Sequence, residues 1–324
     1  IADLDGNIIH CINKYKGLPN NTVLGLHYSQ SGKLWMGMDY GVSALDLRNN
    51  LTYFFDYRGD FGTGYTALLK DGIFYLGTNQ GLYMSKWEGL NNDTDFIGFQ
   101  LVPETEGQVW TLENIGGDLF IGHDQGLFVL KGNAIQQLSS EHGVWTILPY
   151  KDYLLTGNYN GISTFKKSGN RWEFFKKMEL ILGSCNQVIV EKDNILWINI
   201  PNYGIIRAVL DSNLYPSERL IFPESSFEGD DPCLIRNNEG IHVVTGKFQY
   251  AFNATEKKFT HKTEILSYPR VGALLSGVYQ PVALHPDYEF YPVFNGFALK
   301  YLTNVEKQSG PVNSLVLRKI EAFS

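Results

Sequence analysis

Residues 32–46 read GKLWMGMDYGVSALD, which is an apolar stretch, a polar tetrad that ends in glycine, and a second apolar stretch. Two strands joined by a tight turn have this pattern. Five later segments repeat it, so that its turn glycine recurs after 40, 45, 35, 43 and 92 residues, at Gly41, Gly81, Gly126, Gly161, Gly204 and Gly296. The last gap is far longer than the others, and residues 239–252, EGIHVVTGKFQYAF, are predicted to hold a weaker copy within it.

A repeat of roughly 45 residues that supplies four strands is typical of a β-propeller, in which each blade buries its faces against its neighbours. The competing architecture is a solenoid, but solenoids of this period are mostly helical, and helical periodicity is scarce in this chain. The 33 glycines and the 14% aromatic content suit many tight turns and large side chains between blades. We therefore predict an all-β fold, a seven-bladed β-propeller with four antiparallel strands in each blade.

The two ends of the repeat array predict how the ring is closed. Residues 7–13 have the pattern of an outer fourth strand, whereas the last copy stops after its third strand near Tyr301. Closure removes exposed strand edges. We therefore predict that the N-terminal strand, residues 7–13, completes the last blade. Residues 1–305 are predicted to form a single domain, followed by residues 306–324 as an exit segment.

The composition argues against two classes of partner. A formal net charge of −7 without a Lys or Arg cluster lacks the electrostatic pattern of a nucleic-acid-binding protein. No run approaches the 18 apolar residues of a membrane-spanning helix. Because the sequence begins at Ile1 without Met or a signal sequence, we expect it to be an excised part of a larger protein.

The three cysteines, Cys11, Cys185 and Cys233, fit neither a disulfide framework nor a metal-ligand spacing. Cys185 and Cys233 lie near equivalent strand positions of adjacent blades, which leaves a bond between them conceivable, but buried and inert thiols are the expected state. No Ser-His-Asp order, phosphate-binding Gly loop or paired-carboxylate signature can be extracted. We predict no metal, no cofactor and no catalytic residues, and we expect that this fragment is not an enzyme.

A specific family resemblance is found in residues 17–46, GLPNNTVLGLHYSQSGKLWMGMDYGVSALD. The Gly-Leu-Pro loop, the Asn-x-Val strand start and the Gly-x-Leu-Trp-x-Gly strand closely resemble the regulator-propeller repeat of bacterial two-component sensors. The later copies keep less of the pattern, since the Trp is replaced by Tyr75, Phe120 and Leu155 before it returns as Trp197. Residues 311–323, PVNSLVLRKIEAF, resemble the lead-in to the triple-tyrosine immunoglobulin-like domain that follows the propeller in these sensors.

The resemblance implies an extracytoplasmic sensor domain of a signalling regulator, located in the periplasm as part of an inner-membrane protein. It further implies a downstream triple-tyrosine domain in the same chain, a homodimer of the full-length protein, and an output through a histidine kinase or a LuxR-type transcription regulator. The membrane would be reached only through segments outside this sequence. Because such families are abundant in glycan-degrading bacteria, the ligand that we expect is a glycan-derived oligosaccharide.

Ligand-binding residues are expected where the turns between the second and third strands meet the starts of the first strands, because both emerge on one face of a propeller. Amides, carboxylates and aromatic rings there suit sugars. A competing explanation is that Asn and Asp before Gly serve the turn itself, and that the rings pack between blades. The candidates are Asp39, Tyr40, Asn79, His123, Asn158, Tyr159 and Asn202 at the turns, and Tyr65, Trp110, Trp145, Asn186 and Arg270 at the strand starts.

Three further interpretations follow from the pattern. Trp35 and Trp197, which lie in second strands among apolar neighbours, are predicted to be core residues. A metal-dependent propeller lyase is one alternative function, in which His123 and His142 approach each other beside Asp124 and Glu141. Another alternative is a scaffold for interaction or dimerisation within the same regulator, with the ligand bound elsewhere.

Overall fold

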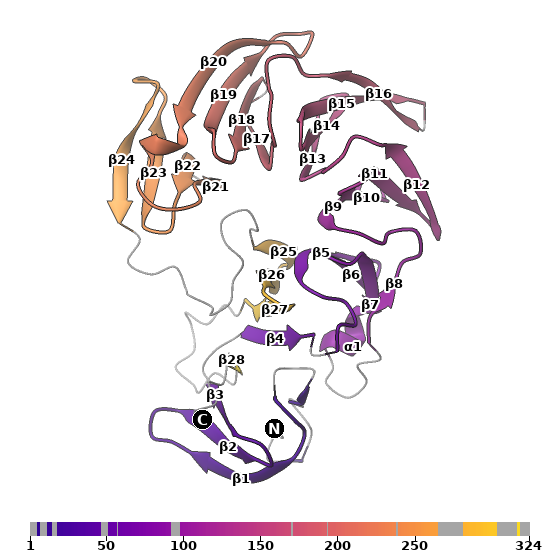
Figure 1. Ribbon diagram of the computed structural model, residues 1–324, viewed down its shortest axis with the longest axis vertical. Helices are drawn as coiled ribbons and strands as arrows, with labels where there is room; N and C mark the ends of the chain where they lie inside the picture. The colour runs from indigo at the N-terminus through magenta and orange to yellow at the C-terminus, as the bar shows by residue number, and fades with distance from the viewer. Residues whose placement is uncertain are drawn as a thin grey trace. The chain divides into compact units, whose positions relative to one another are not determined.

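The computed structural model (Figure 1) is an all-β protein in which the described strands form seven four-stranded antiparallel sheets. Two compact units contain them, residues 1–106, 271–274 and 280–324 in the first and residues 107–270 and 275–279 in the second. The structure describes residues 5–6, 12–14, 18–46, 51–56, 58–91, 98–169, 171–192, 194–237, 239–264, 281–302 and 316–317.

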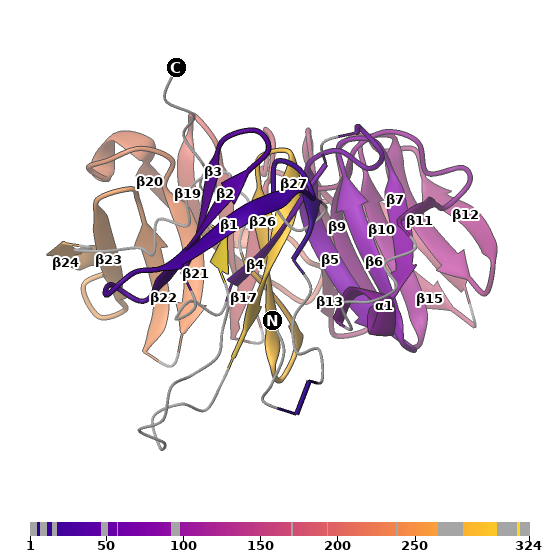
Figure 2. The same ribbon diagram turned by 90° about the horizontal axis from the view of Figure 1, so that it is seen from below.

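The second unit contains four sheets, each of which is a simple up-and-down meander. Figure 2 shows β9 to β12 side by side in chain order. This is the arrangement that the repeat predicts, with one hairpin in the middle of each sheet. The sheets are β9 (Val109–Ile115), β10 (Asp118–His123), β11 (Gly126–Lys131) and β12 (Ala134–Ser139); β13 (Thr146–Tyr150), β14 (Tyr153–Asn158), β15 (Gly161–Ser168) and β16 (Arg171–Lys177); β17 (Gln187–Lys192), β18 (Ile195–Ile200), β19 (Gly204–Leu210) and β20 (Pro216–Pro223), followed by a 3-10 turn, η2 (Glu224–Ser226); and β21 (Cys233–Asn237), β22 (Gly240–Val244), β23 (Phe248–Asn253) and β24 (Lys258–Glu264).

The first unit contains three sheets, and in two of them the fourth strand comes from a distant part of the chain. One short helix, α1, precedes the fourth strand of the remaining sheet. The sheets are β1 (Val23–Tyr28), β2 (Lys33–Met38), β3 (Val42–Asp46) and β28 (Val316–Leu317); β25 (Val282–His285), β26 (Tyr288–Val293), β27 (Gly296–Tyr301) and β4 (Leu51–Phe55); and β5 (Gly64–Lys70), β6 (Ile73–Thr78), β7 (Leu82–Lys86) and β8 (Gln100–Leu101), with α1 (Trp87–Asn91) between β7 and β8.

The recurring turn glycine has a steric cause. A Cβ atom at Gly126 would overlap the carbonyl oxygen of Ser139, and one at Gly204 would overlap that of Phe222. Both carbonyls belong to the fourth strand of the same sheet, and both glycines have positive φ, 136° and 133°. A side chain at this position would displace the fourth strand from the hairpin, so only glycine combines the turn with a complete sheet.

Neighbouring sheets within each unit pack face to face through large apolar side chains. In the second unit, Phe165, Cys185 and Trp197 belong to three successive clusters that join one sheet to the next. In the first unit, Phe74 of β6 stacks on Phe297 of β27 with ring centroids 5.5 Å apart. Such contacts between successive sheets are the packing of propeller blades.

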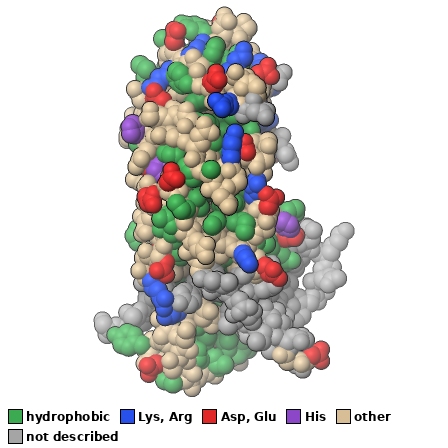
Figure 3. Space-filling view, turned by 90° about the vertical axis from the view of Figure 1, so that its right-hand side faces the viewer, with side chains coloured by type: hydrophobic (Ala, Val, Ile, Leu, Met, Phe, Trp, Pro, Cys, Tyr) green, Lys and Arg blue, Asp and Glu red, His purple; other side chains and the backbone are tan. Residues whose placement is uncertain are grey.

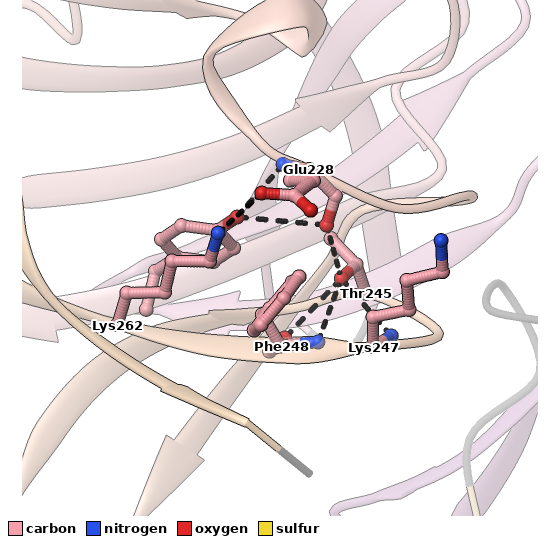
Figure 4. A network of polar contacts seen from close by, with 6 residues as sticks. Glu228, Thr245, Lys247, Phe248 and Lys262 are labelled. Carbon is pink, nitrogen blue, oxygen red and sulfur yellow. Dashed lines mark hydrogen bonds and ion pairs between the residues drawn. The ribbon is translucent and has the colours of Figure 1, made fainter.

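The weakest copy of the repeat, residues 239–252, forms the hairpin β22–β23 as predicted. At the position of the turn glycine this copy has Phe248, and the Thr245 hydroxyl stabilises the turn (Figure 4). The Thr245 hydroxyl accepts the backbone N–H of Lys247 and of Phe248 at 3.3 and 3.1 Å and donates to the carbonyl of Glu228 at 2.8 Å. Lys262 pairs with the Glu228 carboxylate and lies 3.7 Å from the centroid of the Phe248 ring. The second copy keeps its turn glycine, Gly81, beside the same kind of contact, in which the Thr78 hydroxyl accepts the backbone N–H of Gln80 and of Gly81.

The strand that completes the last sheet differs from the prediction. β4 pairs with β27 in the position that we assigned to residues 7–13, of which residues 7–11 lie outside the described part of the chain. The physical reason is a buried aromatic pair, because Phe54 stacks on Phe297 with centroids 4.7 Å apart. Within the predicted exit segment, Val316–Leu317 pairs with β3. Of the two predicted core tryptophans, Trp197 is fully buried, but Trp35 is 42% exposed, so that its assignment to the core was wrong.

Cys185 and Cys233 are buried, as expected, whereas Cys11 lies outside the described residues. Burial raises the pKa of the Cys185 thiol to about 12. We expect neither thiol to react with a disulfide reagent at about pH 8 in the folded protein, and both to react after denaturation. Mass spectrometry of the labelled peptides distinguishes them from Cys11. Rapid labelling of Cys185 in the native protein would contradict this assignment.

Candidate ligand-binding surface

Within the sheets, the turns after the second strands lie beside the starts of the first strands, as the sequence predicts. In each of four sheets, a backbone N–H of the turn donates to a carbonyl that precedes or begins the first strand. Both groups of candidates therefore lie at the same end of their sheet. The bonds run from Asp39 to Thr22 at 3.2 Å, from Asn79 to Thr63 at 3.1 Å, from Asp124 to Gln108 at 2.9 Å, and from Tyr159 to His142 at 3.2 Å.

Two of these turn residues use their side chains to reinforce the same contact. The Asn79 carboxamide oxygen accepts the backbone N–H of Thr63 at 2.8 Å. The Asp124 carboxylate accepts that of Gln108 at 3.1 Å. Each pair closes a small ring of hydrogen bonds between the turn and the strand start, so these polar groups contribute to the turn in the way that the competing explanation describes.

Three candidates are buried in the structure. Asn158 is completely buried and donates from Nδ2 to the Ser163 hydroxyl at 2.8 Å. His123 lies with its Nδ1 2.7 Å from the Asp124 carboxylate, and the same nitrogen accepts the backbone N–H of Gln125 at 3.0 Å. Asn186 is also buried, at the start of β17. These three side chains are buried beneath the turns and strand starts, and they present little surface to a ligand.

Trp110, Trp145 and Tyr159 are brought together, and we call them the aromatic cluster. The ring centroids of Trp110 and Trp145 are 4.1 Å apart, and those of Trp145 and Tyr159 are 5.7 Å apart. Trp110 belongs to β9, whereas Trp145 directly precedes β13 and Tyr159 lies in the β14–β15 turn. The indole N–H of Trp145 donates to the Ser184 hydroxyl at 3.0 Å, which fixes the ring orientation. The cluster therefore joins two successive sheets, β9–β12 and β13–β16.

Tyr159 is the most exposed member of the aromatic cluster. Its side chain is 40% exposed, and its ring covers the backbone at Gly143, where a Cβ atom would overlap it. Burial raises the pKa of the Tyr159 hydroxyl. The hydrogen bond with the nearby Trp110 indole lowers this pKa, and the Asp124 carboxylate raises it further. The hydroxyl is therefore neutral near pH 7 and is available as a hydrogen-bond donor and acceptor at the rim of the cluster.

The remaining candidates are distributed over both units. Asn202 has positive φ, 62°, and its backbone serves the β18–β19 turn, while the adjacent Tyr203 is exposed. Asp39 and Tyr40 are exposed in the β2–β3 turn of the other unit, and that unit also contains Asn79 and the half-buried Tyr65. Arg270 lies outside the described residues. Ser184 was not predicted; its only sequence signal is its position two residues before Asn186.

The groups considered for a lyase are engaged in other contacts. His142 is exposed, with Nδ1 3.1 Å from the carbonyl oxygen of Asp124. Glu141 pairs with Lys177 at 2.7 Å. Among the described residues, no three His, Cys, Asp or Glu side chains converge as a metal site would require. The arrangement around His123 is that of a buried turn residue, and no observation favours the lyase.

One face of the molecule carries charges of both signs. On the face shown in Figure 3, acidic and basic side chains are interspersed over the described part, so neither sign dominates that face. Among the described residues there is no helix with the length and apolar character needed to cross a membrane.

Comparison with solved structures identifies the fold. The chain superposes with a TM-score of 0.57 and 13% identity on the extracellular domain of the hybrid two-component system BT4673 from B. thetaiotaomicron, over 88% of this chain and 47% of that chain. The corresponding domain of BT3049 from the same organism gives a TM-score of 0.51 and 12% identity, over 88% and 46%. This chain thus spans less than half the length of these solved chains. No protein-family profile matches the sequence. No curated protein matches it either. At these identities the likeness concerns the fold.

Proposed function

We propose that this chain is the extracytoplasmic ligand-recognition domain of a bacterial two-component signalling regulator, and that it binds an oligosaccharide at the aromatic cluster. The observation that carries the proposal is the convergence of Trp110, Trp145 and Tyr159 from two successive sheets into one aromatic cluster. The likeness in fold to extracellular domains of hybrid two-component systems supports the signalling role.

The chemistry of the aromatic cluster suits a sugar. Aromatic rings cover the apolar C–H face of a pyranose, while fixed polar groups bind its hydroxyls. Around the rings, the structure supplies the Tyr159 hydroxyl and the partly exposed Gln108 and Asp124 side chains. The hydrogen bond from Trp145 to Ser184 holds the central ring in place, which lowers the entropy lost on binding.

In the complete regulator, ligand binding would have to change the arrangement of domains. A ligand shifts such an equilibrium only by its different affinity for the two states. We propose that the domain lies in the periplasm, attached to a triple-tyrosine domain of the same chain, and that the full-length protein is a homodimer. The seven-bladed propeller would then transmit the signal of ligand binding to the triple-tyrosine domain through residues 306–324. The membrane and the kinase or transcription-regulating output belong to other segments. The alternative is that the domain is a scaffold that binds no ligand, and the following experiment distinguishes this alternative from a sensor.

Replacing Trp145 by alanine is expected to weaken oligosaccharide binding at least about tenfold, which corresponds to about 1.4 kcal/mol, because the central ring of the cluster is lost. Calorimetric titration with a panel of glycan fragments measures the affinity. Tyr159→Phe should cost less, since only the hydroxyl is removed. Phe174→Ala is the control, because Phe174 is an exposed aromatic residue on β16 of the same unit and lies outside the aromatic cluster.

Two results would refute the proposal. Unchanged affinity of Trp145→Ala for a saccharide that binds the wild type would place the site elsewhere. No heat with any oligosaccharide, together with no change in oligomeric state when the downstream domain is attached, would favour the scaffold over the sensor.

A further inference from the structure

The loop between β16 and β17 presents an apolar side chain at the end of the second unit that carries the aromatic cluster. Leu182 in this loop is 75% exposed, whereas Ile181 before it is 1% exposed and packs in the core between two sheets. The backbone N–H of Gly161, which begins β15, donates to the carbonyl of Gly183 at 2.7 Å. The loop therefore lies against the β14–β15 turn, which contains Tyr159.

The same loop also lies against the next sheet. A Cβ atom at Gly183 would lie 3.0 Å from the Cγ2 atom of Ile200, the last residue of β18. The backbone N–H of Tyr203, in the β18–β19 turn, donates to the carbonyl of Ile200 at 3.1 Å, and that of Asn186 donates to the carbonyl of Asn199 at 3.1 Å. The turns of two successive sheets thus hold the loop from both sides.

Three exposed side chains lie in these adjacent elements, and we call them the ridge. They are Tyr159, Leu182 and Tyr203, which are 40%, 75% and 49% exposed. Single exposed apolar residues are common on protein surfaces, whereas neighbouring ones mark binding surfaces. The ridge belongs to the two middle sheets of the second unit, each of which packs against a sheet of the same unit on both sides. Its exposure therefore does not depend on the first unit.

The chemistry of the ridge suits an uncharged sugar chain. Residues 159–161, 182–184 and 201–203 read YNG, LGS and PNY, so no side chain among them is charged at neutral pH. The tyrosine rings and the leucine can cover apolar C–H groups, and the exposed carboxamides of Asn160 and Asn202 can bind hydroxyls. Because the loop is held on both sides, little of its motion is lost on binding.

Two cations near the ridge are engaged in other contacts. The Arg219 guanidinium donates to the carbonyl of Leu180 at 2.8 Å, and the Lys177 ammonium pairs with the Glu141 carboxylate at 2.7 Å. At the cluster end of the ridge, the Asp124 carboxylate acts on the hydroxyl of the cluster tyrosine. An anionic sugar would lose hydration here and would meet a carboxylate of the same sign. A neutral sugar does not incur this cost.

We infer that the ligand site at the aromatic cluster continues along the ridge, so that the domain recognises an extended, uncharged oligosaccharide and not a single terminal sugar. Trp145 and Tyr159 would contact one part of this ligand, while Leu182 and Tyr203 would contact sugars further along it. Because successive sheets pack about 10 Å apart, the ridge is longer than one sugar ring. The inference rests on the proposed function, since it extends the same site.

Calorimetric titration with neutral oligomers of glucose, mannose, galactose, xylose and arabinose, each from the dimer to the hexamer, tests the inference. In the series that binds most tightly, we expect the hexamer to bind at least about tenfold more tightly than the dimer, because its additional sugars contact the ridge. Tyr203→Ala should weaken binding of the hexamer at least about fivefold and that of the dimer less than about twofold. Trp145→Ala should weaken binding of both.

Tyr215→Ala is the matched control and should change neither affinity. Tyr215 is 38% exposed and follows β19, whereas Tyr203 precedes β19, so the two tyrosines lie at opposite ends of the same sheet. Hydrogen exchange of the wild type gives a second readout. The hexamer should slow exchange of residues 180–184 and 201–204, and the dimer should leave these two segments unchanged.

Failure of the inference can be distinguished from failure of the proposed function. Equal affinities of dimer and hexamer, both weakened by Trp145→Ala, would limit the site to the aromatic cluster and leave the proposed function intact. An equal loss of both affinities in Tyr203→Ala would show that Tyr203 forms no separate part of the site. Tighter binding of a galacturonic acid hexamer than of the neutral hexamer would contradict an uncharged ligand. Absence of binding by every oligomer would refute the proposed function and the inference together.

Discussion

Replacement of Trp197 by alanine is expected to lower the free energy of unfolding by about 3 to 5 kcal/mol, the usual cost of emptying the site of a large buried aromatic residue. The indole is fully buried between two sheets, with Phe252 edge-on at 4.6 Å and Phe222 stacked at 6.0 Å between ring centroids. Its N–H donates to the Glu191 carboxylate at 2.8 Å, and the Arg207 guanidinium lies 5.9 Å from the ring centroid. Alanine at position 197 leaves a cavity and removes the indole N–H that donates to the Glu191 carboxylate.

The matched control is Trp35→Ala, because Trp35 occupies the same position of the repeat but is partly exposed. In the 324-residue chain, this change should cost no more than about 1 kcal/mol. Urea unfolding followed by circular dichroism measures both. Equal losses for the two variants would contradict the assignment of Trp197 to the inter-sheet core.

Replacement of Asp56 by alanine is expected to cost about 3 kcal/mol or more, because one buried carboxylate satisfies several backbone donors. The side chain is buried and accepts the N–H groups of Asp60 at 2.8 Å, Phe61 at 2.9 Å and Gly62 at 2.5 Å. The backbone of Asp56 also exchanges two hydrogen bonds with Asn295, of 3.0 and 3.1 Å. Asp56 thereby fixes the connection from β4 to β5 beside the β26–β27 turn.

The stabilisation by Asp56 should depend on pH. Burial alone would raise the pKa of the Asp56 carboxyl, but the backbone donors of Gly62, Phe61, Asp60 and Arg58 together hold it below its ordinary value. A carboxyl with a lowered pKa in the folded state stabilises the protein above the unfolded pKa, which is about 3.9, and loses this contribution as the pH falls through the folded pKa.

Asp56→Asn isolates the charge, since the amide keeps the shape of the carboxyl. We expect the difference in urea midpoint between the wild type and Asp56→Asn to be largest near neutral pH and to shrink below about pH 4. Asp56→Ala should stay less stable than the wild type at every pH, because its acceptor atoms are missing. A difference between wild type and Asp56→Asn that is independent of pH would refute the role of the charge.

The hairpins of the repeat could be predicted because their determinants are local. The glycine at the start of the third strand and the apolar stretches on both sides define the turn. The weakest copy has Phe248 in place of that glycine and still forms the hairpin, with the turn held by the Thr245 hydroxyl. The fourth strands could not be assigned in the same way. Leu51–Phe55 has the pattern of an outer strand for any blade, and its position beside β27 results from tertiary packing of Phe54 on Phe297.

The candidate site was predictable in part for a similar reason. Equivalent positions in adjacent copies placed Trp110 and Trp145 together, and the structure brings their ring centroids to 4.1 Å, with the rings tilted by 31°. The sequence does not say whether a turn side chain points outward or folds back, and Asn158 folds back onto Ser163. Ser184 belongs to a loop outside the repeat pattern, so only the structure connects it to Trp145.

The most direct test of ligand recognition by the aromatic cluster is hydrogen exchange of the chain with and without a saccharide selected by calorimetry. We predict that the saccharide slows exchange at the strand starts and turn that carry the cluster, residues 108–112, 143–147 and 157–161, and leaves β1 unchanged. Protection confined to other residues, while these three segments exchange as in the free protein, would contradict the account.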